Sequence, residues 1–302
     1  MIALLAPGQG SQTPGMLAPW LELAGAADQV SLWSKLTGLD LQRLGTTASA
    51  EEITDTAVTQ PLVVAAALLA YAELTRDGAV PQELVTAGHS VGELAAAAIA
   101  GVIGVDEAVS LAAVRGAEMA KACALVPSGM SAVLGGDEQA VLARLAELNL
   151  EPANRNAAGQ IVAAGKLDDL EALAANPPEK ARVRALPVAG AFHTQFMAPA
   201  EDAVAAAAAK ITPSDPVRTL LSNADGQAVA SGTEALERLV AQVTRPVRWD
   251  LCTATLRESA PAALVELPPA GTLVGIAKRE MRGTPTLALK TPDDLAQFRE
   301  LG

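Results

Sequence analysis

Histidine is scarce in this chain of 302 residues, which contains only His89 and His193. A serine needs a nearby base to become a nucleophile near neutral pH, and imidazole is the usual base. Any serine chemistry in this protein therefore has two candidate bases.

Aromatic residues and positive charge are also scarce. The chain has three tryptophans, one tyrosine and three phenylalanines, and its 22 Lys and Arg residues are outnumbered by 34 Asp and Glu residues, a net charge of −12. A nucleic-acid surface needs basic side chains for the phosphates and often aromatic ones for the bases. The composition argues against nucleic acid as a partner, and an acidic partner would need a local basic patch.

Long hydrophobic runs and cysteines are few. The longest apolar runs, 62–72 and 94–105, are shorter than the ~18 to 20 residues that span a bilayer. Residues 1–7 lack a basic flank and predict a first strand, not a signal peptide. Cys123 and Cys252 show no metal-ligand or redox spacing and are expected to be buried thiols. We expect a cytoplasmic protein with no membrane contact, no metal and no cofactor.

Short apolar runs alternate with Ala- and Leu-rich helical stretches along most of the chain. The predicted buried strands are 2–5, 84–87, 217–221, 263–267 and 286–289. The predicted helices are 60–74, 91–100, 106–122, 198–210 and 249–258. This alternation is typical of an α/β fold with a parallel sheet.

The segment between Pro127 and Pro187 has a different order of elements. Strand patterns at 130–134, 151–154, 160–164 and 182–188 and helical patterns at 137–148 and 167–175 give the order βαββαβ, which is typical of a ferredoxin-like unit. We therefore predict a large α/β subdomain, residues 1–126 and 190–302, with a small ferredoxin-like subdomain, 127–189, inserted into it.

Gly88, Ser90 and Gly92 form a G-x-S-x-G pattern between a predicted strand and a predicted helix. This is the context of a nucleophile elbow, in which the backbone crowds the serine and glycines relieve the crowding. The N-terminus of the helix would direct N–H groups toward negative charge on an acyl oxygen. The pattern also fits a glycine-rich turn whose serine only caps the helix.

The two histidines differ in their position relative to Ser90. His89 directly precedes it, and successive side chains diverge on a sharp turn, so we expect a structural role for His89. His193 lies in a loop before the predicted helix 198–210 and is then the candidate base. Without Ser90, His193 would be interpreted as a packed or solvated loop histidine.

Two further features suggest a ligand site. The loop 8–12 follows the first strand, where α/β proteins place ligands. Thr13 stands where a dinucleotide fingerprint has glycine, so a nicotinamide cofactor is disfavoured, and Gln9 with its backbone would suit an oxyanion. Arg115 falls on an apolar helix stripe, four residues after Leu111. It needs an anion, which is either a protein carboxylate or a substrate carboxylate.

Taken together, five motifs resemble those of the malonyl-CoA:acyl carrier protein transacylases and span essentially the whole chain in that family's order. They are residues 8–12 (GQGSQ), 88–93 (GHSVGE), 115–116 (RG), 190–193 (GAFH) and 242–249 (QVTRPVRW). The resemblance implies an α/β-hydrolase-like large subdomain with a ferredoxin-like small one. It also implies ping-pong transfer of a malonyl group from malonyl-CoA to the phosphopantetheine thiol of acyl carrier protein, in fatty acid or polyketide biosynthesis. Members of the family are commonly monomeric, so we expect a monomer.

The resemblance implies a role for each motif residue. Ser90 would be the nucleophile and His193 its base. The backbone N–H groups of Gln9 and Val91 would form the oxyanion hole, and the main-chain carbonyl of Gln242 would orient the histidine.

Other residues would bind the substrate. Arg115 would pair with the malonyl carboxylate. Phe192 resembles the malonyl-selective form of its motif, in which an aromatic ring leaves no room for an α-methyl group; one such clash discriminates by ~1 to 3 kcal/mol. Further expected substrate-binding positions are Met119, Asn154, Asn156 and Asn223.

Acyl carrier protein is generally acidic, so a basic surface is expected where it binds. The candidate residues are Lys278, Arg279, Arg282, Arg182 and Arg184. The alternative is that these five side chains only form a solvent-exposed surface and bind no partner.

Two other functions fit parts of the sequence. A serine thioesterase or hydrolase would use the same elbow with water as the acceptor. A noncatalytic carrier-protein or nucleotide-binding module would form no covalent adduct with malonyl-CoA.

Overall fold

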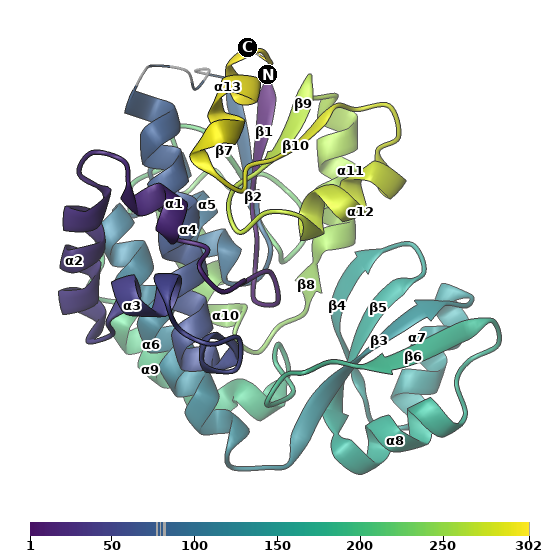
Figure 1. The fold of residues 1–302 in the computed structure, drawn as a ribbon. Helices are drawn as coiled ribbons and strands as arrows, with labels where there is room; N and C mark the ends of the chain where they lie inside the picture. Colours follow the sequence, from purple (N-terminus) through teal and green to yellow (C-terminus); the bar gives the residue numbers. More distant parts are fainter. Residues whose placement is uncertain (77, 79, 81–82, 302) are drawn as a thin grey trace.

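The computed structural model describes residues 1–76, 78, 80 and 83–301 and contains two five-stranded sheets (Figure 1). The first sheet is parallel throughout, with the strand order β10-β9-β1-β2-β7. Its strands are β1 Ile2–Ala6, β2 Leu84–Gly88, β7 Thr219–Leu221, β9 Ala263–Glu266 and β10 Thr286–Ala288. The predicted parallel α/β pattern is confirmed.

Helices cover both faces of this sheet, because β1 is apolar on both sides. Ile2 and Leu4 belong to a core shared with α4, α5 and α6, whereas Ala3 and Leu5 pack in a second core with α11 and α12. The helices outside the second sheet are α1 Ala18–Leu21, α2 Ala26–Thr37, α3 Leu41–Thr46, α4 Thr56–Arg76, α5 Gly92–Ala100, α6 Val105–Cys123, α9 Ala198–Ala208, α10 Gly232–Ala241, α11 Trp249–Ser259, α12 Thr272–Glu280 and α13 Leu295–Arg299. Short 3-10 turns lie at η1 Glu52–Thr54, η2 Gln195–Met197 and η3 Pro292–Asp294.

Helix α4 is longer than the sequence pattern predicts. It begins at Thr56 and not at Gln60, because the Asp55 side chain accepts a hydrogen bond from the Ala57 amide and starts the helix one turn earlier. By length and composition α4 is able to cross a membrane, but 72% of its apolar window is buried inside the fold. Burial of this kind is typical of a core helix.

The second sheet has the strand order β6-β3-β5-β4-β8. It contains β3 Ser128–Gly135, β4 Glu151–Ala157, β5 Gln160–Lys166 and β6 Ala181–Ala185, with helices α7 Glu138–Glu147 and α8 Leu167–Ala175 against one face. The order βαββαβ is as predicted, and β6 ends before Pro187, which has no N–H for the ladder. The fifth strand, β8 Val247–Arg248, comes from outside residues 127–189 and pairs parallel to β4.

The carboxyl ends of β1 and β2 lie side by side and face the small sheet (Figure 1). Ala6 and Gly88 are register partners at these ends, so the loop after β1 and the turn after β2 emerge together. The loops that carry Gln9 and Ser90 therefore meet at this edge, which is where open α/β sheets place ligands.

Candidate active site

Ser90 lies on a tight turn between β2 and α5. Its φ of 54° is in the left-handed region, which only a closely packed turn imposes on a residue other than glycine. A side chain at Gly88 would overlap the backbone of Gly92, and one at Gly92 would overlap the carbonyl oxygens of Ala6 and Pro7. The glycines of the G-x-S-x-G pattern are therefore needed for close backbone contact, as an elbow requires.

His193 reaches Ser90 from the loop before α9. The Ser90 Oγ and His193 Nε2 atoms are 2.7 Å apart, and His193 Nδ1 is 2.8 Å from the main-chain oxygen of Gln242. A carbonyl oxygen only accepts, so Nδ1 carries the proton and donates. The other ring nitrogen, Nε2, is then an acceptor for the Ser90 hydroxyl.

The environment keeps His193 neutral. Its ring is buried, and burial together with the positive charge of Arg115 lowers the pKa of His193 to about 3. A neutral imidazole with Nε2 toward a hydroxyl has the form of a general base.

Arg115 is buried beside Ser90 without an ion pair. Its guanidinium donates to Gln60 Oε1 at 2.6 Å, to Gln242 Oε1 at 2.9 Å and to Ser90 Oγ at 3.4 Å. Burial lowers the pKa of Arg115 to about 10, partly opposed by the charge of Glu93. No carboxylate oxygen of the described residues lies within 4.0 Å of the guanidinium. The charge therefore lies at the cavity with neutral oxygens as its direct partners, and Glu93 acts on it only from a distance.

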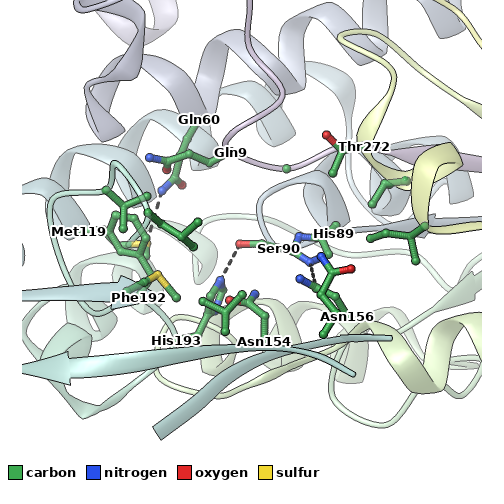
Figure 2. A pocket seen from close by; sticks show the side chains of 18 of the residues that line it. Gln9, Gln60, His89, Ser90, Met119, Asn154, Asn156, Phe192, His193 and Thr272 are labelled. Atoms are coloured by element: carbon green, nitrogen blue, oxygen red, sulfur yellow. Dashed lines mark hydrogen bonds between the residues drawn. The ribbon is translucent and has the colours of Figure 1, made fainter. Parts of the chain in front are cut away.

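A cavity with about 860 Å³ of empty space, part of it open to solvent, lies over Ser90. In Figure 2, Gln60, Met119 and Phe192 gather on one side of Ser90, and His89, Asn156 and Thr272 on the other. The predicted residues that line it are Gln9, Ser90, Arg115, Met119, Asn154, Asn156, Phe192 and His193. Further lining residues are Met130, Gln160 and Val162 on the small sheet, Leu186 and Val188 after β6, and Thr272, Leu273 and Ile276 on α12.

Two backbone amides have no acceptor among the described residues, one at Gln9 in the cavity lining and one at Val91 directly after Ser90. In the part of the chain that the structure describes, the N–H groups of Gln9 and Val91 donate to no other group. The Gln9 side chain instead donates to Thr56 Oγ1 at 3.2 Å. Val91 itself is buried at the start of α5.

His89 contacts the small sheet. Its Nε2 lies 2.8 Å from Asn156 Oδ1 on β4, and its ring meets Trp249 edge-on at 5.6 Å between ring centroids. Burial lowers the pKa of His89. It makes no hydrogen bond with Ser90 Oγ, which bonds to His193 instead.

Some predicted residues lie away from the cavity. Asn223 is fully buried behind Ser90, where its Oδ1 accepts from the Ser90 amide at 2.8 Å and its Nδ2 donates to the Gly88 carbonyl at 2.7 Å. Lys278 and Arg279 on α12, Arg282 after it, and Arg182 and Arg184 on β6 are all exposed. Asn223 thus holds the elbow from behind, and the five cations lie on the surface.

Two residues of the site, Gln60 and Glu93, are not predicted from the sequence. Gln60 binds both Arg115 and the Met119 sulfur, at 3.5 Å for the latter. Glu93, in the 88–93 motif, accepts hydrogen bonds behind Ser90 from the Asn223 amide and from Gln242 Nε2. Glu93 precedes a run of leucine and alanine residues in α5, five of which are buried. A glutamate beside such an apolar run could have indicated a buried carboxylate with hydrogen-bond partners.

Comparison with known proteins agrees with this geometry. The acyl transferase domain family model matches residues 4–291. The malonyl CoA-acyl carrier protein transacylase of Mycobacterium tuberculosis (strain ATCC 25618 / H37Rv) is 68% identical over 302 residues and the whole of both chains. That of Escherichia coli (strain K12) is 32% identical over 311 residues and 99% of both chains.

Solved structures agree as well. The crystal structure of the Mycobacterium tuberculosis enzyme matches with a TM-score of 0.97 at 68% identity over 99% of each chain. A malonyl-transacylase in complex with its type II polyketide acyl-carrier protein matches with a TM-score of 0.91 at 29% identity, over 100% of this chain and 99% of that one. The chain therefore belongs to the acyl transferase domain family, as one of its malonyl CoA-acyl carrier protein transacylases.

Proposed function

We propose that this chain transfers a malonyl group from malonyl-CoA to the phosphopantetheine thiol of acyl carrier protein through an ester on Ser90. The observation that carries the proposal is the pair of contacts at Ser90 Oγ, with the neutral His193 at 2.7 Å and the unpaired Arg115 guanidinium at 3.4 Å. A nucleophile with its base and a buried cation without an anion suit an acyl group that ends in a carboxylate.

In the first half-reaction the Ser90 hydroxyl attacks the thioester carbonyl while its proton passes to His193 Nε2. The free amides of Gln9 and Val91 bind the oxyanion of the tetrahedral intermediate. When the intermediate collapses, the carbon–sulfur bond breaks, and coenzyme A leaves as a thiol with the proton from His193. Gln242 holds the imidazole through its main-chain carbonyl, so no third acid is needed for orientation.

The second half-reaction reverses these steps with a different thiol. The phosphopantetheine thiol gives its proton to His193 and attacks the ester carbonyl. The intermediate then expels Ser90, whose oxygen regains the proton from His193. The products are malonyl carrier protein and free enzyme, ready for another cycle.

The cavity has a place for each part of the substrate. We assign the malonyl carboxylate to Arg115 and the carbon between the two carbonyls to the space beside Phe192 and Met119, which line the cavity. Asn154 and Asn156 on β4 also line the cavity, and their side-chain amides suit the amides of a pantetheine arm.

The basic residues suit an acidic carrier protein at the mouth of the cavity. Leu134 on β3 is the register partner of Gln160 on β5 and of Arg182 on β6. Directly paired residues point to the same face of a sheet. Since Gln160 lines the cavity, Arg182 shares its face. Arg279 reaches the same Gln160, donating to its Oε1 at 2.7 Å.

None of the five candidate cations, Lys278, Arg279, Arg282, Arg182 and Arg184, forms an ion pair with a residue that the structure describes. In a chain with a net charge of −12, exposed cations such as Arg182 and Arg279 on the side of Gln160 favour a negatively charged partner.

A serine hydrolase with the same elbow is the alternative, and one experiment separates the two. Enzyme loaded with malonyl-CoA and freed of excess substrate is split between buffer and buffer with phosphopantetheinylated carrier protein. We expect the malonyl group to move to the carrier thiol much faster than it appears as free malonate. If the enzyme loses its malonyl group equally fast with and without carrier protein, hydrolysis is favoured. If the wild-type enzyme forms no malonyl adduct, a noncatalytic binding module is favoured.

The remaining proposals concern the molecule as a whole. We infer a large subdomain of residues 1–126 and 190–302 and a small one of 127–189, supported by the two separate sheets, with β8 added to the small sheet from the large subdomain. We also infer a monomer in the cytoplasm that serves fatty acid or polyketide biosynthesis. The net charge of −12 and the burial of α4 support the cytoplasmic placement.

A further inference from the structure

Glu93 is a buried carboxylate behind Ser90 that the proposed reaction does not use. It lies in the first turn of α5, with 3% of the residue exposed. Its Oε1 accepts from the Asn223 amide at 2.9 Å, and its Oε2 accepts from the side-chain nitrogen of Gln242. Both carboxylate oxygens therefore face donors, an arrangement that an ionised carboxylate satisfies.

Glu93 is the charged member of the three acceptors that fix which way the Gln242 amide points, the others being the Ser90 main-chain oxygen and Asn223 Oδ1, each 3.2 Å from Gln242 Nε2. A carboxylate accepts and a guanidinium donates, so the Gln242 NH₂ group must face Glu93 and its Oε1 must face Arg115. The distances agree, since Arg115 Nη2 donates to Gln242 Oε1 at 2.9 Å. Burial raises the pKa of Glu93 to about 7, so above this pH one amide links a buried anion to a buried cation.

This indirect link keeps Arg115 open to a ligand. Glu93 is the carboxylate whose charge stabilises the protonated form of Arg115. A direct ion pair between them would have to break before a substrate carboxylate could bind, which is strongly unfavourable for two buried charges. With Gln242 in between, the guanidinium is oriented and partly balanced, and its face toward the cavity stays free.

The same network reaches the other reacting groups. The main-chain carbonyl of Gln242 holds His193, and Asn223, which Glu93 fixes through its amide, accepts from the amide of Ser90. If Glu93 only supports the turn that carries Ser90, its loss should slow acylation by every acyl substrate equally. If Glu93 acts through Arg115, its loss should slow acylation mainly by substrates that carry a carboxylate.

We propose that Glu93 is a positioning residue that sets the preference for malonyl over uncharged acyl groups, by fixing the Gln242 side-chain amide toward Arg115. This inference rests on the proposed function, in which Arg115 binds the malonyl carboxylate.

Glu93→Gln keeps the shape of the side chain and removes the charge. Its single oxygen then faces two donors, the Asn223 amide and the Gln242 NH₂ group, and its own NH₂ group needs an acceptor. The Ser90 main-chain oxygen and Asn223 Oδ1 still accept from Gln242 Nε2, so we expect the Gln242 amide to shift out of line with Arg115 and not to turn over. At pH 8, we expect the second-order rate of enzyme acylation by malonyl-CoA to fall at least about tenfold further than that by acetyl-CoA, as for a lost charge-assisted hydrogen bond.

Glu266→Gln is the matched control. Glu266 is also a fully buried carboxylate, and it accepts from the amides of Gly271, Leu273 and Val274 at the start of α12, not from the Arg115 network. We expect Glu266→Gln to lower thermal stability and to leave the malonyl to acetyl ratio as in wild type.

A double variant completes the test. In an Arg115→Ala background, Glu93→Gln should change the ratio no further, because the group that it acts through is gone. If Glu93→Gln does not fold, Gln242→Leu serves instead, since it removes the side-chain link and keeps the main-chain carbonyl on His193, and it should lower the ratio to a similar extent.

The outcomes separate this inference from the proposed function. An unchanged ratio of malonyl to acetyl acylation in Arg115→Ala would show that Arg115 does not bind the malonyl carboxylate. A lower ratio with Arg115→Ala and an unchanged ratio with Glu93→Gln or Gln242→Leu would overturn the role of Glu93 alone. An equal fall for both substrates in Glu93→Gln would make it a support of the elbow and would also overturn the proposal.

Discussion

The two walls of the cavity are built differently. On the Ser90 wall, a buried network joins Arg115, Gln242, Asn223 and Glu93. On the small-sheet wall, the side chain of Asn154 makes no hydrogen bond with any described residue, and the exposed Arg279 donates to Gln160, which lines the cavity.

The difference separates chemistry from recognition. Reacting groups must hold one geometry, which a fully bonded, buried network provides. A wall that receives a long, flexible arm and a second protein needs groups with free bonding capacity. We therefore expect changes in the first wall to affect stability and the chemical step, and changes in the second to affect affinity.

The largest expected effect concerns the buried wall and pH. The folded chain keeps His193 neutral down to about pH 3, whereas in the unfolded chain it takes up a proton below its ordinary pKa of 6.5. Between these values the unfolded state binds more protons, so the free energy of unfolding falls as the pH is lowered, by up to about 1.4 kcal/mol per pH unit. Above pH 6.5 this contribution is complete.

Urea unfolding of wild type and His193→Gln between pH 7 and pH 4 measures this effect. The wild type should lose up to ~3 kcal/mol more stability than the variant over this range. His89, whose pKa burial also lowers, is present in both proteins and cancels in the comparison. Parallel pH profiles for the two proteins would show that His193 is not held neutral by the fold.

Arg115→Ala should affect selectivity next most strongly. Removal of the guanidinium should slow acylation by malonyl-CoA roughly 100-fold, in the range for loss of one partner of a buried charge pair, and should slow acylation by acetyl-CoA much less. Rapid-quench measurement of both rates checks this. Arg144→Ala, which removes an arginine on α7 that is paired with Glu147, is the control and should change neither rate. Equal losses for both substrates would rule out the carboxylate clamp.

Phe192→Ser should relax the preference against an α-methyl group. The ring is buried at the cavity beside His193, and its removal should raise the ratio of methylmalonyl to malonyl acylation about tenfold, as for one pocket contact. Phe196→Ser offers a comparison, since Phe196 is partly buried outside the cavity lining. If Phe192→Ser and Phe196→Ser both keep the wild-type ratio of methylmalonyl to malonyl acylation, the Phe192 ring does not exclude the α-methyl group.

The smallest expected effect concerns the open wall. Reversal of Lys278 and Arg279 to Glu should slow transfer to carrier protein a few-fold at low ionic strength and weaken its dependence on salt, because rim charges act mainly on association. Acylation by malonyl-CoA should be affected less. Reversal of Lys35 and Lys210, exposed residues on α2 and after α9, should leave transfer unchanged. A wild-type salt dependence in the first variant would place carrier binding elsewhere.

These two walls also differ in how far the sequence predicts them. The elbow is local, so the spacing of Gly88, Ser90 and Gly92 between a strand and a helix was enough to predict its shape, and two histidines left few choices of base. The ferredoxin-like order was equally readable, because each of its elements has its own hydrophobic period.

The network behind Ser90 was not predictable in this way. Gln242 is 127 residues from Arg115 and 149 from Glu93, so their contacts depend on how the helices pack and not on any local pattern. The sequence placed Arg115 on an apolar stripe and left its anion open. The structure supplies amide oxygens from Gln60 and Gln242, which a search for opposite charges would not find.

The central claim is that Ser90 carries the malonyl group between the two substrates. Intact-mass spectrometry of the protein mixed with malonyl-CoA, without carrier protein, tests it directly, with Ser90→Ala as the control. We predict the mass of a single malonyl group on the wild type, located on the peptide that contains Ser90, lost on addition of carrier protein and absent from Ser90→Ala. An unmodified wild type, or the same adduct on Ser90→Ala, would contradict the account.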